Sequence, residues 1–187
     1  MGLTLGGIQH AIQHWGRDRS WIPRAPLLLA MIYLSLRHLS DPDYSSLLGG
    51  LNLGIHEAGH LLFGLLPFEF LMVLGGTVLQ LSAPALSAWM FLRQPDYFAV
   101  AFCGTWLATN LYSVATYVAD AREMDLPLVT VGGGEARHDW NYLLGVTHLL
   151  AWDATLAALI RVAAFLVSWA SVAAGAYVLW SMARSER

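Results

Sequence analysis

The sequence predicts an all-α integral membrane protein, a multi-pass helix bundle, and composition, hydropathy pattern and length support this prediction. The chain of 187 residues is 57% hydrophobic and only 12% charged, whereas a soluble domain is typically about 25% charged. Its apolar residues lie in long stretches that are separated by charged or turn-rich breaks. Because so few polar groups cannot cover a water-facing surface, membrane lipid must surround much of the chain. The length suits one domain covering residues 1–187.

Charge and cysteine content exclude several classes of protein. The net charge is −3, all ten cations are arginine, and no basic stripe is present, so we expect no nucleic-acid partner. Cys103 is the only cysteine, which excludes an internal disulfide and a cysteine-based zinc knuckle. The seven histidines, none adjacent to another, are too few for a membrane di-iron hydroxylase.

Residues 1–20 lack the basic start, apolar run and cleavage site of a secretory signal. They are predicted instead to form an amphipathic helix. Apolar side chains recur there at helical spacing, at Leu5, Ile8, Ile12 and Trp15. Such a helix either lies flat in the lipid headgroup region or packs on the rim of the protein. His10 and His14 have no acidic neighbour in this helix and are expected to be solvated.

The apolar stretches predict about five membrane-spanning helices. Their approximate ranges are 25–36, 46–66, 70–92, 97–119 and 140–182. The last range is too long for one span of about 20 residues, so we expect a break near Asp153. Pro84 is expected to kink the third helix, and residues 120–139 form a polar connector. The arginines are nearly balanced between the two sides, so no membrane orientation is predicted.

The second stretch contains the sequence His56-Glu57-Ala58-Gly59-His60. On a helix, the four-residue spacing puts both imidazoles on one face, one turn apart, where they can bind one Zn²⁺ at roughly 2.0–2.1 Å. Glu57 can hold the water on the metal and accept its proton. Such polar groups are unfavourable in an apolar span unless they form a site. The motif therefore predicts a zinc site, and a hydrogen-bonded polar cluster is the alternative.

The motif resembles that of intramembrane zinc metallopeptidases of the site-2 protease class, which carry H-E-x-G-H within a membrane helix. The resemblance covers the second stretch only, and it implies hydrolysis of a peptide or membrane-protein substrate in or near the bilayer. That class usually takes its third ligand from an Asp-Gly pair, which this sequence lacks. The segment 137–142, with Asp120-Ala121-Arg122 upstream, is also similar to small bacterial membrane proteins that carry H-E-x-G-H, which implies a bacterial cytoplasmic membrane.

The third metal ligand must come from another position, and the possible residues are His138, Asp139, His148 and Asp153. His138 is the first choice because it follows a Gly-rich connector that can fold back toward the metal. Asp139 is the close second, or else it caps the helix that starts at Trp140 or supports the ligand. We expect His148 to be a helix-contact residue, and Asp153 to mark the break in the last stretch.

Three more polar side chains lie inside the predicted spans. Asn52 precedes His56 by one helical turn, so it can orient the imidazole. Asn110 either lines a catalytic cavity or forms an interhelical hydrogen bond. For Gln80 the interhelical hydrogen bond is favoured.

Two functions of different classes fit these residues. The first is a compact zinc metallopeptidase in which His56, His60 and His138 hold Zn²⁺ and Glu57 is the general base. The second is a non-catalytic accessory subunit, bound to other membrane subunits, whose metal is a structural staple with four protein ligands. The small chain, without a visible substrate-recognition domain, favours the second. Water in the fourth metal position would indicate the enzyme, and a fourth side chain would indicate the staple.

Overall fold

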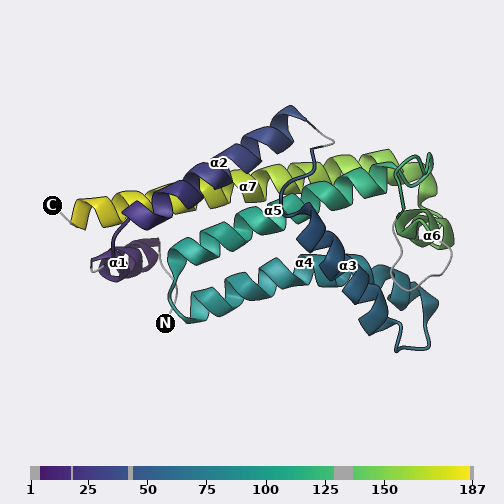
Figure 1. Cartoon of the computed structure of the whole chain (residues 1–187), viewed down its shortest axis with the longest axis horizontal. Coiled ribbons are helices and arrows are strands. Elements are labelled where there is room, and N and C mark those ends of the chain that lie inside the picture. Colours follow the sequence, from purple (N-terminus) through teal and green to yellow (C-terminus); the bar gives the residue numbers. More distant parts are fainter. Residues whose placement is uncertain (1–4, 18, 42–43, 129–136, 186–187) are drawn as a thin grey trace.

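The computed structural model describes residues 5–17, 19–41, 44–128 and 137–185, and within these ranges all regular structure is helical. The elements are α1 (Leu5–Gly16), η1 (Ile22–Arg24), α2 (Ala25–Ser40), α3 (Gly49–Phe63), α4 (Glu69–Arg93), α5 (Tyr97–Ala119), α6 (Asp139–Val146), η2 (Leu150–Trp152) and α7 (Asp153–Ser185). Helices α4, α5 and α7 run side by side along the long axis (Figure 1). Helix α1 lies at one end of this bundle and α6 at the other. The predicted all-α class is confirmed.

Three helices in the described part of the chain are long and apolar enough to cross a membrane: α4, α5, and α7 with the preceding η2. The three α-helices have 25, 23 and 33 residues, whereas a hydrocarbon layer of about 30 Å needs about 20. Helices α2 and α3, with 16 and 15 residues, are shorter. The number of about five spans stays a prediction.

The break expected near Asp153 is present, because α6 ends at Val146 and α7 begins at Asp153 itself. The buried Asp153 carboxylate accepts hydrogen bonds from Arg122 Nε and from the Ala154 backbone N–H, both at 2.6 Å. Arg122 follows the end of α5. This ion pair therefore joins the end of α5 to the start of α7.

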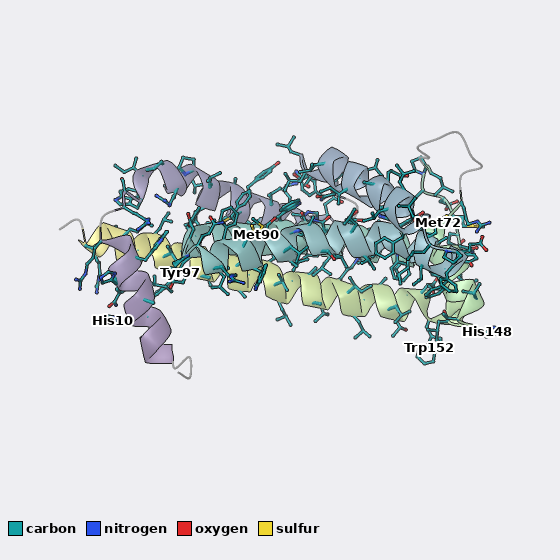
Figure 2. All side chains as sticks on the ribbon, turned by 90° about the horizontal axis from the view of Figure 1, so that it is seen from below. His10, Met72, Met90, Tyr97, His148 and Trp152 are labelled. Carbon is teal, nitrogen blue, oxygen red and sulfur yellow. The ribbon has the colours of Figure 1, made fainter. Side chains whose placement is uncertain are left out.

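The C-terminal part of α1 packs on the protein itself. Trp15 is buried in an apolar cluster with Met182 of α7 and Phe98 of α5. His10 and His14 are exposed, as expected. Figure 2 shows that His10 and Tyr97 lie toward this end of the molecule, whereas His148 lies at the opposite end.

Helix α3 packs closely along α4, whereas its backbone lies farther from α5, which it reaches through the side chain of Asn52. The close approach depends on glycine, because a Cβ at Gly59 would overlap the backbone of Gly75 and Gly76 on α4. The histidine motif therefore lies at the contact between α3 and α4, with its imidazoles beside Gly76.

Candidate metal centre

Helix α3 brings His56 and His60 together, one turn apart, with their ring centroids 4.7 Å from each other. His56 is buried, and Glu57 is partly buried beside it. Potential ligand atoms of His56, Glu57 and His60 all lie within 4.8 Å of one another. These three residues form a group, found among the described residues, that could hold a metal ion.

The outer nitrogen of each imidazole is held by a hydrogen bond. His56 Nδ1 lies 2.9 Å from Gln80 Oε1, and His60 Nδ1 lies 3.0 Å from the Met72 carbonyl oxygen. Because both oxygens are acceptors, each Nδ1 carries a proton, and this leaves Nε2 as the nitrogen of each ring that can bind a metal. Metal-binding histidines are typically oriented by such a second contact.

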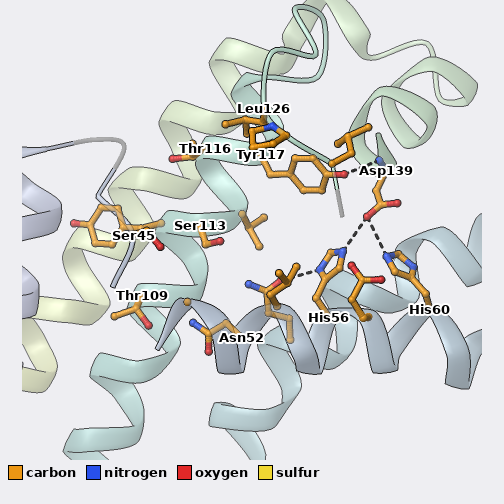
Figure 3. Close-up of a pocket in the computed structure, with 18 of the residues that line it drawn as sticks. Ser45, Asn52, His56, His60, Thr109, Ser113, Thr116, Tyr117, Leu126 and Asp139 are labelled. Carbon is orange, nitrogen blue, oxygen red and sulfur yellow. Dashed lines mark hydrogen bonds and ion pairs between the residues drawn. The ribbon is translucent and has the colours of Figure 1, made fainter. Parts of the chain in front are cut away.

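The carboxylate of Asp139, the first residue of α6, meets both Nε2 atoms (Figure 3). Its Oδ2 lies 2.9 Å from His56 Nε2 and 3.1 Å from His60 Nε2. Two imidazole lone pairs and one carboxylate oxygen are all hydrogen-bond acceptors. Such a convergence is stable only if a cation, either a proton or a metal ion, lies among the three atoms.

The geometry of these three atoms fits a metal ion. Ligand atoms at 2.0–2.1 Å from a tetrahedral Zn²⁺ are roughly 3.3 Å apart, slightly more than the 2.9 and 3.1 Å between Asp139 Oδ2 and the two Nε2 atoms. A small outward movement of the Asp139 carboxylate therefore makes room for the ion. Two imidazoles and a carboxylate suit Zn²⁺ and other divalent transition metals. The group can therefore hold a divalent metal with one or more positions left open.

Gly76 is a part of the site that the sequence analysis missed. A Cβ at this position would lie 2.6 Å from His60 Nε2 and 2.7 Å from His56 Nε2, in the space that a metal ion needs. The pair Gly75-Gly76 within an apolar helix is a sequence signal for close helix approach. It does not by itself indicate that the approaching atoms are metal-ligand nitrogens.

His138, the first choice for the third ligand, faces away from the histidine pair. Its Nδ1 accepts a hydrogen bond from the Asn141 backbone N–H at 3.1 Å, and its Nε2 lies 3.1 Å from Asp120 Oδ2. The imidazole thus caps α6, a role expected for Asp139, and both of its nitrogens are engaged. Because the cap holds His138 on one side of the helix start, the next residue, Asp139, points toward α3.

Two other expectations are corrected. Asn52 does not orient His56: its Oδ1 accepts a hydrogen bond from Trp106 Nε1 at 2.8 Å, and Gln80 holds the imidazole instead. His148 is not a helix contact, because it is exposed in the turn after α6 with a φ of 58°.

Asn110 is fully buried within α5, away from the residues that line the cavity beside the histidines. Its Nδ2 donates a hydrogen bond to the Trp106 carbonyl oxygen at 3.0 Å, within the same helix. Gln80, by contrast, lines this cavity and forms the interhelical bond that was favoured for it.

The site opens into a cavity of about 1030 Å³ between α3 and α5. Ligand pockets typically have about 300–1000 Å³, so this one can hold more than a water molecule. Its lining includes the metal-site residues His56, Glu57, His60 and Asp139, and a set of polar side chains, among them Asn52, Thr109, Ser113 and Tyr117. Glu57 accepts no hydrogen bond from the described residues, so its carboxylate is available to a bound molecule.

The segment leading into α6 is fastened at the rim of the cavity. Arg137 forms an ion pair with Glu69 at the start of α4, and its guanidinium lies 5.0 Å from the Tyr142 ring centroid. The hydrogen bond that Arg137 donates to the Glu69 carboxylate raises the pKa of Arg137 above its ordinary value. Burial would raise the pKa of Asp139, but a proton shared with His56 and His60 across these contacts favours the ionised carboxylate and lowers this pKa. The carboxylate is therefore ionised at neutral pH.

Comparison with protein-family models, curated proteins and solved structures gives no match to this chain. The function is therefore inferred from the geometry of the site.

Proposed function

We propose that this protein is a multi-pass membrane metallopeptidase that uses zinc to hydrolyse a peptide bond in or near the bilayer. His56, His60 and Asp139 would hold the metal, and Glu57 would be the general base. The observation that carries the proposal is the convergence of three acceptors, at 2.9 and 3.1 Å, with Nδ1 of each histidine already bonded elsewhere. Asp139 replaces His138 in the ligand set because both nitrogens of His138 are engaged.

The bound metal would polarise the peptide carbonyl and acidify water, as zinc does in hydrolases. Glu57 accepts a proton as the water oxygen attacks the carbonyl carbon. It then returns this proton to the nitrogen as the C–N bond breaks, which yields a carboxylic acid and an amine. The carboxylate of Glu57, which lines the cavity and has no hydrogen-bond partner among the described residues, suits this role.

Membrane insertion is supported by α4, α5 and α7, which are long and apolar enough to span a bilayer. Many of their large apolar side chains are exposed, including Leu86, Leu159 and Leu166, at about 60%. Lipid would cover such side chains. The lipid-facing surface and the cavity beside α3, which is lined by apolar as well as polar side chains, together support a substrate that is itself in the membrane.

The accessory-subunit alternative needs a fourth protein ligand, and Glu57 is the carboxylate placed to supply it. In that case the metal would be closed to water. We favour the enzyme because the site borders a cavity of about 1030 Å³, whereas a structural metal needs no such space.

The test compares the membrane proteomes of bacterial cells that produce the wild type, Glu57→Gln or Glu123→Gln. Glu123 is an exposed carboxylate beyond the end of α5 and serves as the matched control. The proposal expects an uncut membrane protein to accumulate with Glu57→Gln only. Identical proteomes, with four protein ligands on the metal by X-ray absorption, would instead establish the accessory subunit.

A further inference from the structure

The face of α5 that lies across the cavity from α3 carries a row of hydroxyl groups. Thr109, Ser113 and Tyr117 line the cavity and are spaced four residues apart, so they lie above one another on one helix face. Figure 3 shows them on the opposite side of the cavity from His56 and His60. The row begins beside the metal site, because the Tyr117 hydroxyl accepts a hydrogen bond from the Asp139 backbone N–H at 3.1 Å.

Ser113 is the most unusual member of this row. It is exposed in the middle of α5, a helix whose other side is deeply buried, and its hydroxyl has no hydrogen-bond partner among the described residues. A serine inside an apolar helix usually bonds to a neighbouring helix or to its own backbone. Ser113 instead presents a hydroxyl to the cavity that is available to a bound molecule.

Asn52 provides a matching donor from α3. Its Oδ1 is occupied by Trp106 Nε1 at 2.8 Å, and this contact fixes the orientation of the amide. The NH2 group therefore lies on the other side of the amide, and the residue lines the same cavity. The part of the cavity between α3 and α5, from Thr109 to Tyr117, is called the groove below. Hydrogen-bonding groups border it on both sides, from Asn52 on α3 and from Ser113 on α5.

The dimensions favour an extended chain in this groove. Thr109 and Tyr117 are eight residues apart on a helix, about 12 Å at 1.5 Å per residue, which is the length of about four residues of extended polypeptide. A helix in the membrane has already satisfied its backbone groups internally, but an unwound segment has not. Hydroxyl and amide groups along the groove would satisfy those backbone groups.

We propose that the groove between α3 and α5 binds about four residues of the substrate, in extended form, on one side of the bond that is cut. Ser113 and the Asn52 amide hydrogen-bond to the substrate backbone. The substrate class is therefore a membrane segment that is unwound at the cut, rather than an intact helix. This inference rests on the proposed peptidase function.

The test measures ligand binding to cobalt(II)-loaded protein through the visible spectrum of the metal. Three hydroxamates are compared. The first is acetohydroxamate, and the second is tetra-alanine with its C-terminal carboxyl converted to a hydroxamate. The third is tetra-alanine with an N-terminal succinyl group whose free carboxyl is the hydroxamate, so that the peptide runs away from the metal in the opposite direction. One of the two peptide probes should bind at least about 10-fold more tightly than acetohydroxamate. Ser113→Ala should weaken that probe by about 3–10-fold, the effect of one hydrogen bond, and leave acetohydroxamate binding unchanged.

Ser87→Ala is the matched control, because Ser87 on α4 bonds within its own helix and lies outside the cavity lining. Unchanged acetohydroxamate binding also shows that Ser113→Ala is folded. If acetohydroxamate binds but neither peptide chain adds affinity, or if Ser113→Ala has no effect, the groove proposal is overturned and the peptidase proposal stands. If wild-type protein binds no acetohydroxamate, the metal has no open position, and both proposals are overturned.

A second inference comes from the distribution of arginine, which is independent of the metal site. Five arginines gather at the α1 end of the bundle: Arg17, Arg19, Arg24, Arg93 and Arg184. Among the described residues at this end, these arginines are accompanied by a single acidic side chain, that of Asp96. At the α6 end the balance is reversed. Arg122 and Arg137 are each paired with a carboxylate, and Asp120, Glu123 and Asp125 lie at or just after the end of α5.

Tryptophan accompanies the arginines of the α1 end. The guanidinium groups of Arg19, Arg93 and Arg184 lie 4.6, 5.1 and 4.1 Å from tryptophan ring centroids. Tryptophan is enriched at membrane–water interfaces, and arginine at the cytoplasmic face. Anionic phospholipids of the cytoplasmic leaflet attract such clusters.

We infer that the α1 end lies in the anionic headgroup layer of the cytoplasmic leaflet, with the metal site toward the opposite face. The test uses a Cys103→Ala background, in which Ser20→Cys marks the α1 end and Glu123→Cys marks the α6 end. A membrane-impermeant maleimide should label Glu123→Cys in intact cells and Ser20→Cys only after permeabilisation. Labelling with the opposite pattern, or of both positions in intact cells, would overturn the inference.

Discussion

The Nε2 atom of His56 lies 2.9 Å from the carboxylate of Asp139, a residue 83 positions later in the chain. This contact joins α3 to the start of α6 and provides the third member of the proposed ligand set, of which the histidine motif supplies two. Arg137, two residues before Asp139, forms an ion pair with Glu69 on α4, which holds the start of α6 close to α4. A carboxylate that approaches two lone pairs must be held in place until a cation binds.

The first prediction concerns the metal. Wild-type protein purified without chelators should contain about one zinc per chain, and the double variant His56→Ala, His60→Ala should contain none, as measured by inductively coupled plasma mass spectrometry. His10→Ala, His14→Ala is a matched control, because this pair has the same spacing on the exposed face of α1. Equal metal content in the two double variants would contradict the site.

The second prediction separates Asp139 from its neighbour. Asp139→Ala removes a proposed ligand and should weaken zinc binding by at least about 100-fold, above the effect typical of a supporting residue. His138→Gln should retain the metal but lower the melting temperature, because α6 loses its cap, an effect of about 1 kcal/mol. Competition with a chromogenic chelator measures the first effect, and circular dichroism measures the second. Metal loss in His138→Gln alone would reverse the assignment.

The difficulty of choosing between His138 and Asp139 shows where the sequence stops being informative. The histidine motif predicts two ligands because helix geometry alone places residues four apart on one face. Which of two adjacent residues turns toward that face depends on the cap at the start of α6, and this in turn depends on Asp120 and Asn141. Such contacts between distant segments have no periodic pattern in the sequence.

Composition and hydropathy were sufficient for the all-α class and for the break at Asp153. They were not sufficient for Gly76, whose importance depends on how closely α3 approaches α4. In a one-dimensional pattern, Gly75-Gly76 is only a pair of small residues in an apolar stretch. Only the packed helices show that His56 and His60 occupy the space opposite Gly76.

The third prediction tests this close approach. In Gly76→Ala, the added Cβ would lie 2.6–2.7 Å from both Nε2 atoms, so zinc content should fall to background while the protein stays helical. Gly54→Ala on α3 is the control, because a Cβ there meets no atom within 4 Å. It should retain the metal and raise helix stability by roughly 0.5–1 kcal/mol. Full metal content in Gly76→Ala would show that the ion does not bind between α3 and Gly76.

The last prediction concerns Glu57 and distinguishes the enzyme from the structural metal site. As a general base, Glu57 contacts water rather than the metal, so Glu57→Gln should retain zinc affinity within a few-fold. It should lower the rate of cleavage by roughly 10²–10⁴-fold, because an amide cannot accept a proton from water. As a fourth ligand, the same carboxylate would be essential for the metal, and Glu57→Gln would release zinc. Chelator competition on the purified protein measures zinc affinity. The cleavage rate is measured with purified protein on the membrane protein that accumulates in cells with Glu57→Gln. Retained zinc with lost cleavage supports the peptidase, whereas zinc loss in Glu57→Gln would make Glu57 a ligand and the site a structural one.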